Sequence, residues 1–258
     1  DSDSGGATMA PMSALEKTLR YIVLGGIFCM PFVALIVADG VHFFYNLFFP
    51  YITGKSFVFR FIVEIMAGAY LALALISPAY RPRRSVVLAA LAVFVAIIGL
   101  ADVFGVHPFK SLWSNFERMD GWVTLAHVLV LTVITSAMVT KEKMWRWLFW
   151  VSLGVSAYLA IYGFLQVAGV NALGQGGVSS LSARIDGTFG NPIYFAAYML
   201  FHVFVAILML YRERKSTVLR WTYGFLILAQ LFILYHTATR GAIIGLLGGL
   251  LIVAILNI

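Results

Sequence analysis

Between two long apolar segments, the chain reads Arg184-Ile185-Asp186-Gly187-Thr188-Phe189-Gly190-Asn191-Pro192. The stretch has the pattern of a helix start. Asn191 can accept hydrogen bonds from the first backbone N–H groups, and Pro192 suits the first helical position, where no N–H donor is needed. Gly187 and Gly190 allow tight turns or close approach of a ligand. A helix N-terminus favours anions, and the planar guanidinium of Arg184 suits phosphate. The residues alone leave two readings open, a capped helix with a solvated arginine and an anion site.

The composition on either side of this stretch is that of a membrane protein. Hydrophobic residues make up 62% of the 258 residues and charged residues 11%, far from the balance of a soluble domain. Apolar runs of about 20 residues recur along the chain, which predicts an all-α, polytopic integral membrane helical bundle. The one cysteine, Cys29, excludes an internal disulfide. We interpret residues 1–16 as a tag remnant with a flexible N-terminus, and residues 17–258 as one transmembrane helical domain.

The apolar runs predict about eight transmembrane helices: 20–38, 57–77, 86–104, 122–139, 147–168, 192–211, 220–237 and 241–257. Residues 220–258 contain no polar loop, yet as one helix they would be about 58 Å long, so a turn is expected at Arg240-Gly241. Of the 18 basic residues, 12 fall at alternate connections on one side, which the positive-inside rule assigns to the cytoplasm together with both termini. Arg184 and Arg240 then share the external face. The net charge of +7 thus reports topology and does not indicate nucleic acid.

Three segments together resemble one protein family. The first is Arg184 with Gly187-Thr188-Phe189-Gly190-Asn191-Pro192, and the second is Thr237-Ala238-Thr239-Arg240-Gly241-Ala242. The third is the loop Trp113-Ser114-Asn115-Phe116-Glu117-Arg118-Met119-Asp120-Gly121. In this order, each at a membrane edge, they resemble the O-antigen ligases and the related O-antigen polymerases over about residues 20–258. The resemblance implies a multi-pass protein of the bacterial inner (cytoplasmic) membrane.

By this resemblance, the chain would move a glycan from an undecaprenyl-pyrophosphate carrier to a sugar hydroxyl on an acceptor glycan or the lipid A core. Arg184, Arg240 and Asn191 would bind the pyrophosphate, with no metal and no cofactor. The family's catalytic base is attributed to a histidine in a later external loop, so these residues look like the N-terminal portion of such an enzyme. His42 and His107 are weak candidates for that base.

Other polar residues carry further expectations. The rim Trp113, Glu117, Arg118 and Asp120 could meet the glycan or the acceptor. Arg60 and Glu64, four residues apart inside a predicted span, are expected to form a buried structural pair, with a role in the substrate path as the alternative. The sequence has no H-E-x-x-H, cysteine-pair or carboxylate-cluster pattern for a metal.

Three alternatives to a ligase remain open at this point. A polymerase of the same lipid-linked repeat units would differ only in the acceptor. A transporter or flippase of lipid-linked oligosaccharide would also use aromatic and buried charged residues, but it predicts inverted repeats, and none is visible. A non-catalytic membrane scaffold would use the arginines as interfacial anchors.

Overall fold

The computed structural model describes residues 12–40, 47, 49–115, 118–170 and 184–256, and within them the chain is helical with no strand. The elements follow the apolar runs of the sequence. In chain order they are α1 (Ala14–Cys29), the 3₁₀ helix η1 (Met30–Leu35), α2 (Thr53–Ile76), the 3₁₀ helix η2 (Pro78–Tyr80), α3 (Val86–Val103), α4 (Pro108–Trp113), α5 (Trp122–Met138), α6 (Glu142–Val167), α7 (Pro192–Arg212), α8 (Thr217–His236) and α9 (Arg240–Leu256).

The chain is a multi-pass membrane protein built as a helical bundle. Among the described residues, six segments are long and apolar enough to cross a membrane: Ala14–Leu35 (α1 with η1), α2, α3, α6, α7 and α8. Two further helices, α5 and α9, are apolar but shorter, with 17 residues each. At 1.5 Å per residue, each of these is about 26 Å long, slightly less than a hydrocarbon core of about 30 Å.

Local sequence signals set several of the helix ends. The hydroxyls of Ser13, Ser85 and Ser216 accept hydrogen bonds from the first turns of α1, α3 and α8. Helix α1 ends at Cys29 and continues as η1, with Pro31 in its first turn. A proline lacks the N–H donor and crowds the preceding turn, which accounts for the end of the regular α-helix here.

The turn expected between the last two helices is present, but it lies slightly earlier than predicted. Ala238 takes the left-handed conformation at φ 50°, while Gly241 lies inside α9. The prediction that the turn lies at Arg240-Gly241 was therefore wrong, since both residues belong to α9. The short connection 237–239 makes the turn instead, and Arg240 is the first residue of α9.

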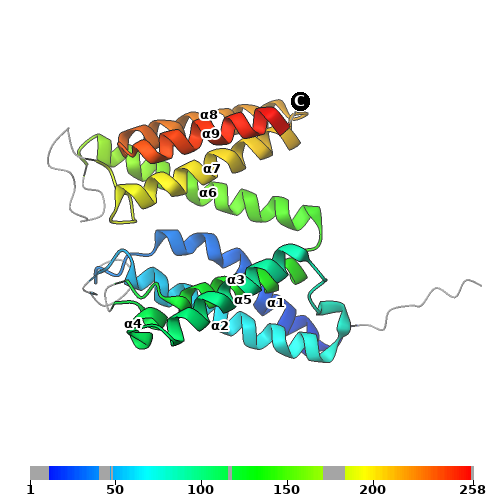
Figure 1. Cartoon of the computed structure of the whole chain (residues 1–258). Helices are drawn as coiled ribbons and strands as arrows, with labels where there is room; N and C mark the ends of the chain where they lie inside the picture. The colour runs from blue at the N-terminus through cyan, green and yellow to red at the C-terminus, as the bar shows by residue number, and fades with distance from the viewer. Residues whose placement is uncertain (1–11, 41–46, 48, 116–117, 171–183, 257–258) are drawn as a thin grey trace, which may run out of the picture.

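The helices form two groups (Figure 1): α1 to α5 in one and α6 to α9 in the other. One buried cluster joins α1, α2 and α5 around Met66, and another joins α6 to α9 around Phe195. Helix η1 packs on α6 and links the groups. In Figure 1, α9 ends at the end of the bundle where α1 begins, and α7 begins at the opposite end, where α4 also lies.

Candidate functional site

The stretch 184–191 forms a tight loop that leads into α7. Phe189 N–H donates to the carbonyl of Asp186 at 3.1 Å, and Gly187 and Gly190 have φ values of +57° and +64°. Residues other than glycine rarely adopt such φ values. A Cβ on Gly190 would also lie 2.5 Å from Cγ of Tyr51. Both glycines therefore have the tight-turn role that the sequence predicted.

Helix α7 begins with the predicted cap. Asn191 Oδ1 accepts from Ile193 N–H at 2.9 Å, and the Asn191 carbonyl accepts from Tyr194 N–H at 3.1 Å. Pro192 occupies the first helical position. The amides of Ile193 and Tyr194 are thus used within the helix start. The positive end of the helix dipole remains as an attraction for an anion, but these two amides are not free to bind one.

Lys55, near the start of α2, holds the loop from one side. Its Nζ donates to the carbonyl of Thr188 at 2.6 Å and to the carbonyl of Ile36 at 2.5 Å, and it lies 5.5 Å from the centroid of the Phe189 ring. Thr188 is buried, and its hydroxyl donates to the carbonyl of Ala34 at 2.7 Å. These contacts join the loop to η1 and α2, and so connect the two groups of helices.

Gln166, at the end of α6, holds the loop from another side. Its Nε2 donates to Asp186 Oδ1 at 3.0 Å, and its Oε1 accepts from Gly187 N–H at 2.9 Å. Burial raises the pKa of the Asp186 carboxyl, and the hydrogen bond from Gln166 partly opposes this rise. The buried amide of Gln166 therefore fixes the turn at Asp186-Gly187.

Arg184 links this loop to the turn between α8 and α9. Its Nε donates to the carbonyl of Thr237 at 2.7 Å, and its Nη2 donates to Thr239 Oγ1 at 2.9 Å. The carbonyl of Thr239 accepts from Ala242 N–H in the first turn of α9. Arg240 follows directly and its side chain is exposed. Two segments more than 50 residues apart, both singled out from the sequence, thus meet at one end of the bundle.

The predicted rim lies near the start of α5. Asp120 accepts a hydrogen bond from the Ser114 hydroxyl at 2.7 Å, which closes the loop between α4 and α5. Trp113 and Arg118 are exposed. Glu117 and the candidate base His42 lie outside the described residues. Arg118 also lines a cavity of about 180 Å³ next to the 184–191 loop.

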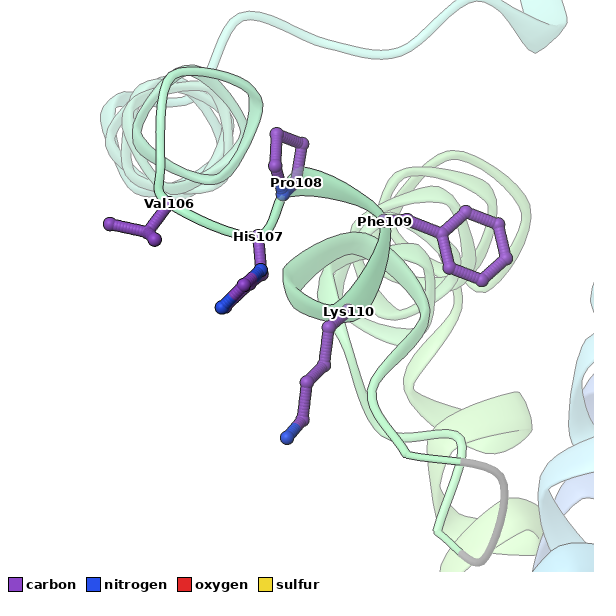
Figure 2. A pocket seen from close by; sticks show the side chains of 5 residues that line it. All are labelled: Val106, His107, Pro108, Phe109 and Lys110. Carbon is purple, nitrogen blue, oxygen red and sulfur yellow. The ribbon is translucent and has the colours of Figure 1, made fainter.

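His107, the other candidate base, lies apart from this loop. It precedes α4 and lines an open cavity of about 510 Å³ formed by residues 106–110 (Figure 2). The side chains of His107 and Lys110 project into the same open space. No residue of the 184–191 loop lines it, so the structure does not bring His107 together with Arg184.

The expected buried pair of Arg60 and Glu64 was wrong in one respect: only the arginine is buried. Arg60 Nη2 donates to the carbonyl of Met119 and, at 2.6 Å, to Thr124 Oγ1. The Glu64 side chain is 64% exposed, and its Oε1 lies 3.3 Å from His127 Nε2. Spacing on α2 puts both residues on one face, but α5 supplies closer polar partners for each of them.

Sequence reasoning did not assign Lys55 or Gln166 to this loop. Gln166, inside an apolar run, could be expected to form hydrogen bonds between helices, but no motif around it points to Asp186 or Gly187 as the partners. One signal for Lys55 was available, since a lysine beside an apolar run must either reach water or find partners. Among the described residues, no three His, Cys, Asp or Glu side chains come together as metal ligands.

No family model, curated protein or solved structure matches this chain.

One prediction follows from the contact between Gly190 and Tyr51. We expect Gly190→Ala to lower the free energy of unfolding by about 1–3 kcal/mol, the usual range for overpacking, because its Cβ would press on the tyrosine ring. Gly224→Ala is the control: it lies in α8 with no atom near its added Cβ, so it should change stability by at most about 1 kcal/mol. Thermal unfolding of both variants in detergent checks this. Equal melting temperatures would mean that Tyr51 does not lie against the loop.

Proposed function

We propose that this chain binds an undecaprenyl-pyrophosphate-linked glycan at the external face of the bacterial inner membrane, as part of a glycosyltransferase that resembles an O-antigen ligase. One observation supports the proposal: Arg184 donates to Thr237 and Thr239, so the two segments of the resemblance meet at one end of the bundle. The guanidinium has five N–H donors, and these two contacts use two of them.

In the proposed reaction, the two segments that Arg184 joins would stabilise the negative charge of the leaving pyrophosphate. In glycosyl transfer, the bond from the anomeric carbon to the pyrophosphate oxygen breaks, and the acceptor hydroxyl oxygen bonds to that carbon as it loses its proton. The leaving pyrophosphate carries the developing negative charge, and fixed cations positioned on it lower the barrier. Arg184 and Arg240 supply two cations, and the start of α7 supplies a positive dipole end. Proton removal from the acceptor requires a general base, which we do not assign to any described residue.

The proposal includes a topology of eight spans, with α5 and α9 crossing the membrane and both termini in the cytoplasm. We expect Lys110→Cys and Asn115→Cys, in a Cys29→Ser background, to react with an impermeant thiol reagent added outside the cell. Arg83→Cys and Arg214→Cys should react only after the membrane is opened. All four positions are exposed, so burial cannot explain a lack of labelling. The reverse pattern would put Arg184 on the cytoplasmic side and contradict the proposal.

The binding function is tested by comparing two lipids on the protein in nanodiscs. We expect undecaprenyl pyrophosphate to bind more tightly than undecaprenyl monophosphate, because the second phosphate engages the second arginine. Equal affinity for the two lipids would mean that the second phosphate makes no contact with the protein, which contradicts a site built from two arginines.

A further inference from the structure

Beside the 184–191 loop lies a cavity that shares only Asn191 and the start of α7 with the proposed pyrophosphate site. Its volume is about 180 Å³. Three parts of the chain form it: the segment before α2, the residue Arg118 before α5, and the start of α7. The residues that line it are Phe49, Tyr51, Ile52, Arg118, Phe189, Gly190, Asn191 and Tyr194.

The size of the cavity suits one small ring. Clefts for drug-sized ligands have volumes of roughly 300–1,000 Å³, and this cavity is smaller. It has room for about six water molecules at roughly 30 Å³ each. A lipid chain or an oligosaccharide would not fit as a whole, but a single terminal unit would.

The lining combines flat apolar surfaces with polar groups. Phe49, Tyr51, Phe189 and Tyr194 contribute rings, and the two tyrosines also carry hydroxyls. Arg118 and Asn191, which also line the cavity, both carry side-chain N–H donors. A phosphate would be better served by several converging cations, and a hydrocarbon by a lining without them. A pyranose, with a C–H face and a ring of hydroxyls, matches both kinds of surface.

The rings are held in place by the loop itself. Tyr51 packs directly on the backbone of Gly190, and Phe189 stacks with Phe195 at 5.6 Å between ring centroids. Burial and the nearby carboxylate of Asp186 raise the pKa of the Tyr51 hydroxyl, so it stays neutral as a hydrogen-bond donor. The loop that Arg184 anchors thus also shapes this cavity.

We propose that the cavity lined by Tyr51, Arg118 and Tyr194 binds one pyranose unit of a glycan substrate. The proposal rests on the proposed function and adds to it a sugar subsite beside the pyrophosphate site. Two glycans could supply the unit, the lipid-linked donor or the acceptor, and both present the same ring chemistry.

The test uses three probes on the protein in nanodiscs: undecaprenyl pyrophosphate, the same lipid carrying one N-acetylglucosamine, and free methyl N-acetylglucosaminide. We expect the sugar-bearing lipid to bind about tenfold more tightly than the bare lipid, a difference of about 1.4 kcal/mol. Tyr194→Ala and Arg118→Ala should remove this difference and leave affinity for the bare lipid unchanged. Tyr211→Ala, at the far end of α7 and 64% exposed, is the matched control and should behave like the wild type.

The free glycoside separates this inference from the proposed function. Saturation-transfer NMR should detect its binding to the wild type and to Tyr211→Ala, and not to Tyr194→Ala, whether or not the bare lipid binds. Binding of the glycoside without any preference for the sugar-bearing lipid would assign the cavity to the acceptor sugar and support the pyranose assignment. If the wild type prefers neither the sugar-bearing lipid nor the glycoside, or if Tyr194→Ala keeps those preferences, the inference is wrong.

Discussion

Lys55→Met is expected to lower the free energy of unfolding by about 3–5 kcal/mol. The Lys55 Nζ donates to two main-chain carbonyls, those of Ile36 and Thr188, and each buried acceptor left without its donor costs about 1–3 kcal/mol. Methionine fills similar space but leaves both carbonyls without this donor. Because these contacts connect η1 and α2 to the 184–191 loop, the loss should also loosen the junction between the two groups of helices.

Chemical unfolding in mixed micelles measures this effect. Lys110→Met is the control, since Lys110 is exposed on α4 at the same end of the bundle, and its change should stay within about 0.5 kcal/mol. Lys55→Gln, which keeps a donor without the charge, should fall between methionine and the wild type. If Lys55→Met unfolds like Lys110→Met, the ammonium does not bridge the two carbonyls.

The two arginines of the proposed pyrophosphate site should differ in their effect on stability. Arg184→Ala removes the donors to Thr237 and Thr239 and should cost about 1–3 kcal/mol, with the lower part of the range favoured by the exposure of the arginine. Arg240→Ala removes an exposed side chain and should change stability by less than about 0.5 kcal/mol. Both substitutions should weaken binding of undecaprenyl pyrophosphate about ten- to a hundredfold.

The matched variant for Arg184 is Thr239→Val, which removes one acceptor but keeps the guanidinium. We expect it to lose part of the stability that Arg184→Ala loses and to retain lipid binding. Thermal unfolding and lipid titration on the same preparations separate the two roles. If Thr239→Val loses lipid binding as fully as Arg184→Ala does, Arg184 acts only by holding the turn.

Much of the helical bundle could be predicted because apolar runs of membrane length have few alternatives to helix. Helix α3 starts at Val86, as the run predicted, because Ser85 caps it. Helix α1 starts at Ala14, before the predicted start at residue 20, because Ser13 caps its first turn. The start of α7 could be predicted from Asn191-Pro192, because a helix cap depends on neighbouring residues only.

The contacts around the loop could not be predicted because they join residues distant in sequence. Lys55 and Thr188 are 133 positions apart. The sequence around either residue contains no signal that the lysine would bond to a main-chain carbonyl. Arg60 shows the same limit. Spacing on α2 favoured Glu64, but the position of α5 supplied Thr124. The meeting of Arg184 with the turn after α8 was foreseen only as a shared membrane face, and the structure adds the direct hydrogen bonds.

The most direct test of the pyrophosphate proposal is the dissociation constant of undecaprenyl pyrophosphate for Arg240→Ala and Arg240→Lys in nanodiscs. Arg240 is exposed, so its replacement should leave the fold intact. We predict about ten- to a hundredfold weaker binding for alanine, and partial recovery for lysine, which keeps the charge but loses the bidentate fork. A folded Arg240→Ala protein that binds the lipid as tightly as the wild type would contradict the account.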